Sequence, residues 1–177
     1  MLINLIYIYV LSNAYLGFPM HEVSSDKPSA QANAVEIETL AAAGQFSIFA
    51  IRVWSSAAKQ RMPIEHALGR FFNDFRCSPA LPLFDECMAL LAVSAIRKVE
   101  IGCCPSNMYV VADEDILLRC FAALDRGTTD KAEKIIGEII ISPLTKTFCR
   151  SALLYVQHLS DAGLAFTRPV NLSVVNT

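Results

Sequence analysis

Charge is scarce in this sequence, and the charges present form no basic surface. Only 18% of the 177 residues are charged, and the formal net charge is −2. No run of Lys or Arg is longer than the pair Arg97-Lys98. Because nucleic-acid binding needs a dense basic face to neutralise phosphates, we expect no nucleic-acid partner.

Familiar catalytic motifs are missing as well. The sequence contains no GxxxxGKS/T, GxGxxG, HExxH, GxSxG or CxxC pattern. Each absence argues against one enzyme class, although together they do not exclude enzymes as a whole. We therefore favour a non-enzymatic protein.

The chain is instead rich in apolar residues. Apolar residues make up 54% of the sequence, which is too many for a disordered chain and enough for a core in one domain. Because few charged residues are available for the surface of the folded protein, we expect an exposed apolar patch that contacts another protein. We therefore expect the protein to form a homodimer or a complex with a protein partner.

The apolar stretch at residues 1–18 has two interpretations. A secretory signal carries Lys or Arg before its apolar run, which is absent here, and a membrane span needs about 20 apolar residues. We favour a native start at Met20 and a cytoplasmic protein. The alternative is a protein exported or anchored through residues 1–18, and membrane contact is expected only if those residues are genuine.

Composition divides the chain into three parts. Residues 1–34 comprise the apolar stretch and a flexible linker without periodicity. Residues 35–166 are predicted to form a single helical domain, and residues 167–177 a loose tail.

Helical spacing of apolar residues runs through most of the central part. It predicts a mainly α fold, a compact bundle of about six helices. The inward stripes include Phe46, Ala50 and Val53; Leu68, Phe71, Phe72 and Phe75; Phe84, Cys87, Met88 and Leu91; Leu117, Cys120 and Phe121; Ile135 and Ile136; and Phe148, Ala152 and Tyr155.

The period changes near residues 99–111. Two β-favouring runs, 99–101 and 109–111, flank a turn-like Pro-Ser-Asn segment, which predicts a short β-hairpin or two extended pieces. Asp113 is then expected to cap the next helix, with Glu114 and Asp115 complementing its dipole.

Cys103 and Cys104 lie in that turn and are the candidate metal ligands. A metal ion would need further ligands, for example Cys77, Cys87 or His66, and the spacing is not that of a structural zinc site. A redox switch and a catalytic thiol assisted by His66 or His158 are alternatives. A fourth interpretation is that one thiol packs inward and the other is incidental.

The other cysteines suggest packing rather than chemistry. An even number of cysteines in a chain with a rich core is weak support for disulfides. Cys87, Cys120 and Cys149 fall on or beside apolar helical faces, where a small hydrophobic residue is expected. Cys77 precedes a Ser-Pro turn, and its role stays open.

The middle of the chain resembles an uncharacterised family of small alphaproteobacterial proteins. The likeness spans roughly residues 45–165 and rests on Phe49-Ala50, Arg52, Met88-Ala89, Arg97, Ile101, Cys103-Cys104-Pro105, Met108 and Ala112-Asp113-Glu114. It implies a bacterial, cytoplasmic protein and supplies no catalytic residues. Members often have three consecutive cysteines, whereas this chain has Gly102 at the first position, which argues against a three-thiol metal site.

The sequence thus favours a non-enzymatic helical module that acts through protein contacts. The alternative is a thiol-based metal-binding or redox-responsive protein that uses the Cys103-Cys104 segment.

Overall fold

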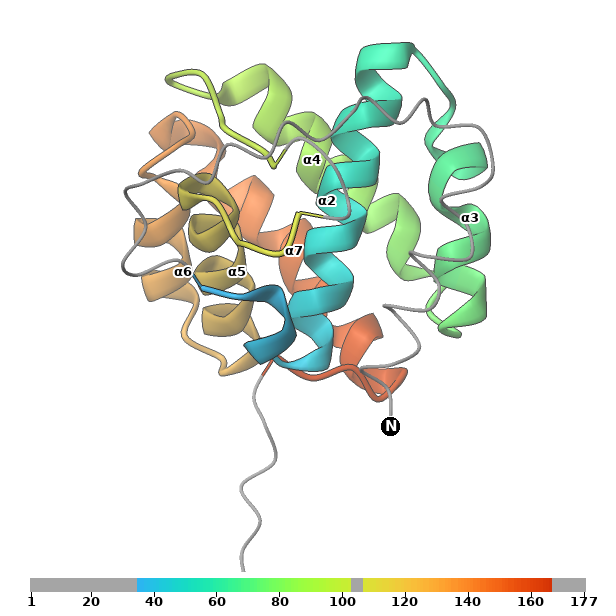
Figure 1. Cartoon of the computed structure of the whole chain (residues 1–177). Coiled ribbons are helices and arrows are strands. Elements are labelled where there is room, and N and C mark those ends of the chain that lie inside the picture. The colour runs from blue at the N-terminus through green and yellow to red at the C-terminus, as the bar shows by residue number, and fades with distance from the viewer. Residues whose placement is uncertain (1–34, 103–106, 167–177) are drawn as a thin grey trace, which may run out of the picture.

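Helices make up most of the described chain. The computed structural model describes residues 35–102 and 107–166 (Figure 1). A short 3-10 helix and six α-helices follow one another: η1 (Ile37–Thr39), α2 (Ala42–Gln60), α3 (Ile64–Asp74), α4 (Ala80–Ser94), α5 (Ala112–Asp125), α6 (Thr129–Ile136) and α7 (Ser142–Asp161). The predicted mainly α bundle is confirmed. The predicted apolar stretch and linker (1–34) and tail (167–177) lie outside the described residues.

The helices pack around α2 and α7. Helix α4 packs along α7, α5 packs against both α6 and α7, and α3 packs against α2. In Figure 1, α2 crosses the front of the bundle, with α3 on one side and the α5–α6 pair on the other.

Aromatic rings join α2 to α3. Phe46 of α2 stacks on Phe71 with ring centroids 4.4 Å apart, and it meets Phe72 and Phe75 edge-on at 4.9 and 5.4 Å. Offset and edge-to-face pairs of this kind add stability beyond the area they bury. The predicted apolar stripes of these two helices therefore face each other.

Tyr155 ties α7 to the centre of the bundle. Its ring contacts Phe84 and Phe121, and its hydroxyl shares a 2.8 Å hydrogen bond with Ser47 of α2. Burial raises the pKa of the Tyr155 hydroxyl, so it stays neutral. In the part of the chain that the structure describes, no buried side-chain N or O lacks a hydrogen-bond partner.

Two helix boundaries differ from the sequence pattern. Regular α-helix begins only at Ala42, seven residues into the predicted helical domain of residues 35–166, and α4 begins at Ala80, before Pro82. Proline is tolerated in a first helical turn because the N–H groups there have no partner within the helix. Pro79 and Pro82 are therefore compatible with a helix that begins at Ala80.

The expected hairpin at 99–111 is not formed by its described residues. Tyr109 pairs in an antiparallel bridge with Glu36, and Ile37 N–H and Val110 N–H donate to Met108 O and Val35 O at 2.9 and 3.0 Å. Residues near 109 thus pair with the start of the described chain, a partner too distant in sequence for a local pattern to indicate.

No helix within residues 35–102 and 107–166 has the length and apolar character needed to cross a membrane.

Candidate functional site

The described residues on either side of Cys103 and Cys104 are held by buried charges. Cys103 and Cys104 themselves fall in residues 103–106, outside the described residues. The chain on both sides of them is described, and it is held by the first turn of α5.

Arg52 of α2 and Glu114 of α5 form a fully buried ion pair. Both side chains have 0% exposure. Arg52 Nε donates to Glu114 Oε1 at 2.7 Å and Arg52 Nη2 donates to Oε2 at 2.8 Å. Two parallel N–H···O bonds fix the planes of both groups relative to each other.

The remaining hydrogen bonds of this pair go to backbone on both sides of residues 103–106. Arg52 donates to Asn107 O at 2.6 Å and to Tyr109 O at 2.7 Å. Glu114 accepts from Gly102 N–H and Val111 N–H, each at 3.0 Å. One buried pair therefore fixes where the segment that carries the two cysteines leaves and rejoins the domain.

Gly102 is required by this framework. A Cβ at residue 102 would lie 2.7 Å from Arg52 Cζ, and Arg52 is held by four hydrogen bonds and cannot swing aside. A cysteine, or any residue with a Cβ, would thus clash with Arg52 at this position.

Asp113 makes a second tie to the same stretch. Its carboxylate binds Arg97 at 2.8 and 2.6 Å and accepts from Glu100 N–H at 2.7 Å. The hydrogen bonds from Arg97 hold the pKa of Asp113 below its ordinary value, and the same contact raises the pKa of Arg97.

The acids at the start of α5 lie in its first turn, as predicted, but Asp113 does not cap the helix and two of the three acids have a further role. Val111, not Asp113, is the N-cap residue. Asp113 and Glu114 are 2% and 0% exposed and bind arginines, while Asp115 alone faces outward and pairs with Arg119 at 2.7 Å. The sequence signal for this was two successive acids on the buried side of a helix, which call for basic partners.

The ligands and bases proposed alongside the two cysteines are not gathered at this site. Cys77 and Cys87 are buried, His66 is exposed on α3, and His158 lies near the end of α7. Among the described residues, which exclude Cys103 and Cys104, no three His, Cys, Asp or Glu side chains are placed to hold a metal ion.

The four described cysteines are core residues. Cys77, Cys87, Cys120 and Cys149 are free thiols with exposures of at most 1%. Burial raises the pKa of Cys77 to about 12 and also raises that of Cys87, while a hydrogen bond with Cys149 and burial raise that of Cys120. The packing interpretation is confirmed for Cys87, Cys120 and Cys149, and it extends to Cys77.

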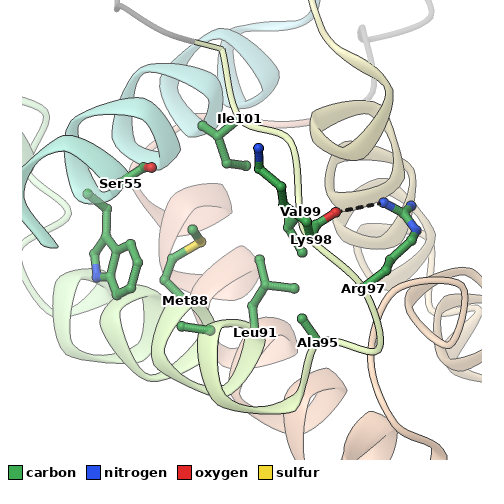
Figure 2. Close-up of a pocket in the computed structure, with 10 residues that line it drawn as sticks. Ser55, Met88, Leu91, Ala95, Arg97, Lys98, Val99 and Ile101 are labelled. Carbon is green, nitrogen blue, oxygen red and sulfur yellow. Dashed lines mark hydrogen bonds between the residues drawn. The ribbon is translucent and has the colours of Figure 1, made fainter. Parts of the chain in front are cut away.

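A shallow apolar groove lies beside the same stretch. It has a volume of about 290 Å³ and runs between α2, α4 and residues 97–101. Trp54, Met88, Leu91, Val99 and Ile101 make most of its wall (Figure 2). Trp54 Nε1–H donates to Asp85 at 2.6 Å, and Figure 2 shows the Lys98 side chain reaching over the groove toward Ile101.

Comparison of the chain with models of protein families, with characterised proteins and with solved structures gives no match. The interpretation of the site therefore depends on its own geometry.

Proposed function

We propose that this protein is a non-enzymatic module that works by protein–protein contact, as a homodimer or with a partner protein. The observation that carries the proposal is the α4 outer face, defined here as Ala89, Ala92 and Val93 of α4 together with Ile96 just after the helix ends at Ser94. All four residues are exposed, Val93 to 80% and Ile96 to 57%.

Helix α4 is apolar on nearly every side. Its inner residues Phe84, Cys87, Met88 and Leu91 are buried in the core, yet the outer face is also without charge between Glu86 and Arg97. A helix that is apolar all round is normally covered on all sides. Supporting this, Ile141, 43% exposed, adjoins the end of α4, where its N–H donates to Ser94 O at 3.0 Å.

Large exposed apolar side chains that adjoin one another are typical of an association surface. The groove extends it, since Ala92 belongs both to the groove and to the outer face of α4. A partner on this face would bury the apolar side chains that the domain itself leaves in water.

Co-purification from the protein's own cells tests the proposal. Tagged full-length chain should retain a partner, either an untagged copy of itself or another protein, and Val93→Asp should lose it. Leu154→Asp is the matched control, because Leu154 is a 42% exposed apolar residue on α7, outside this face. Retention that is unaffected by Val93→Asp, or no Val93-dependent partner at all, would contradict the proposal.

We propose a cytoplasmic location as well, which the resemblance given under Sequence analysis would imply. Fractionation of cells that express the full chain tests this placement, and recovery with membranes or outside the cell would favour the role proposed for residues 1–18.

A thiol function at Cys103 and Cys104 is the second candidate. It is favoured by the Arg52–Glu114 pair, which fixes the backbone at Gly102 on one side of the two cysteines and at Asn107 on the other. Protein purified without oxygen should then contain stoichiometric metal that the Cys103→Ser/Cys104→Ser variant lacks, or thiols that oxidise reversibly. Metal-free protein whose two thiols resist alkylation would eliminate this candidate.

A further inference from the structure

The apolar groove is polar at one end only. Figure 2 shows the Ser55 hydroxyl and the Lys98 ammonium at that end, beside Ile101. Apolar side chains such as Met88 and Leu91 line the rest of the groove. The lining therefore changes from polar to apolar along the length of the groove.

The charge at the polar end is positive. Arg97 and Lys98 are the charged residues among the described residues that line the groove, and both are basic. Arg97 is bound to Asp113. Lys98 is exposed and forms no ion pair with any residue in 35–102 or 107–166. The polar end therefore offers one cation that has no counter-charge in the described chain.

The group that complements this end is a carboxylate. The Lys98 ammonium can only donate hydrogen bonds, and the Ser55 hydroxyl can donate one as well. A carboxylate accepts from both, and its single negative charge matches the single available cation. A phosphate group, with a charge close to −2, would call for further cations.

The rest of the groove suits a hydrocarbon chain. Its walls are aromatic, thioether and aliphatic side chains from Trp54, Met88, Leu91 and Val99. Covering these side chains with hydrocarbon removes apolar surface from water. The groove volume of about 290 Å³ lies at the lower end of the roughly 300–1,000 Å³ that is typical of small-molecule sites, so the ligand is small.

We propose that the groove binds a small amphipathic carboxylate, whose carboxylate lies between Lys98 and Ser55 and whose alkyl chain, of medium length, lies on Met88 and Leu91. The proposal goes beyond a protein-contact function and does not depend on it, because binding of such a ligand needs no partner protein.

The open shape of the groove determines the expected strength of binding. Lys98 is exposed, so water screens its attraction for the carboxylate, and we expect this pairing to tighten binding by about fivefold. A ligand of this size in a shallow groove should have a dissociation constant on the order of 0.1–1 mM.

Octanoate is the probe that tests the proposal, and 1-octanol and octylammonium are matched probes with a neutral and a cationic head. NMR of the full chain with isotope-labelled methionine methyl groups follows each titration. Met88 lines the groove, whereas Met62, between α2 and α3, does not. Octanoate should shift the Met88 signal in a saturable way, leave Met62 unchanged, and bind about fivefold more tightly than 1-octanol.

Variants at Lys98 test the role of the head group. Lys98→Gln should lower the affinity for octanoate by about fivefold, to that for 1-octanol. Lys98→Glu should reverse the preference, so that octylammonium binds more tightly than octanoate. The matched control is Lys146→Gln, which removes an exposed lysine of α7 outside the groove and should leave all three affinities unchanged. Circular dichroism verifies that each variant is folded.

The proposal is overturned if octanoate produces no saturable Met88 shift up to its solubility limit. It is also overturned if the three probes bind equally, or if Lys98→Gln leaves the octanoate affinity unchanged, because the groove would then not recognise the carboxylate. If octanoate does not bind and Lys98→Glu instead loses the Val93-dependent partner, the groove belongs to the protein interface, and the proposed function stands without this ligand.

Discussion

At the scale of single residues, Arg52 and Glu114 do most to define the candidate site. Each is fully buried, and each uses its remaining hydrogen-bonding capacity on backbone flanking residues 103–106. Such a pair costs free energy to desolvate, so it adds less to stability than its short distances suggest. Its main effect here is to fix the backbone in one position.

Removing one charge of this pair should be costly. Glu114→Gln keeps the shape of the side chain but leaves the Arg52 guanidinium buried without a counter-charge, and we expect the free energy of unfolding to fall by about 3–5 kcal/mol. Urea unfolding measures the loss. The matched control is Asp115→Asn, which removes the neighbouring, half-exposed carboxylate and should cost at most about 0.5 kcal/mol. Equal losses for the two variants would contradict the role given to Glu114.

Gly102 gives a second residue-scale prediction. Gly102→Ala places a methyl group against the immobile Arg52 guanidinium and should lower the free energy of unfolding by about 1–3 kcal/mol. The control is Gly69→Ala in α3, whose new Cβ would approach Glu65 Oε1 at 2.8 Å. Glu65 is exposed and can move away, so alanine should stabilise that helix by up to about 1 kcal/mol. The prediction fails if both alanine variants change stability in the same direction.

At the scale of elements, Asp113 connects α5 to residues 97–100, and this tie should depend on pH. Because its folded-state pKa is lowered, Asp113 adds stability above the ordinary aspartate pKa of about 3.9, and this contribution is lost as the pH falls through the lower folded value. Native protein should therefore be more stable than Asp113→Asn at pH 7. The difference between their free energies of unfolding should become smaller below about pH 4.

Urea unfolding of both proteins across that pH range checks the sign. If the difference in free energy of unfolding between the two proteins stays constant, or grows in acid, then Arg97 does not hold the Asp113 carboxylate in its charged form.

Elements were predictable where their pattern is local. Apolar residues three and four apart place Phe71, Phe72 and Phe75 on one face, and the structure buries all three. The pairing of Tyr109 with Glu36 could not be predicted, because backbone hydrogen bonds between distant segments leave no mark in either segment alone.

The same limit applies to the site. Glu114 matched the sequence preference for acids in a first helical turn. Its place on the buried side of the helix indicated a basic partner, but nothing local identified that partner as Arg52, 62 residues earlier in the chain.

At the scale of the whole molecule, four buried cysteines lie within the core, and Cys120 and Cys149 are close enough to share a hydrogen bond. Cys77 lies before α4, and the other three lie in α4, α5 and α7. A thiol reacts as the thiolate and needs access to reagent, so each of these must await an opening of the bundle.

We expect no alkylation of these four cysteines in the native protein, and joint alkylation across the urea unfolding transition. Mass spectrometry of peptides identifies each labelled residue, and fully unfolded protein supplies the reference for complete labelling. Labelling of one of the four under native conditions would show that its helix opens separately from the rest.

The position of Trp54 makes the groove visible to spectroscopy. It is the single tryptophan of the chain, it lines the groove, and its indole N–H is bound to Asp85 of α4. Fluorescence excited selectively at the indole thus comes from one known place. A partner that covers the groove would change the water around that indole, and the emission would then report association without any added label.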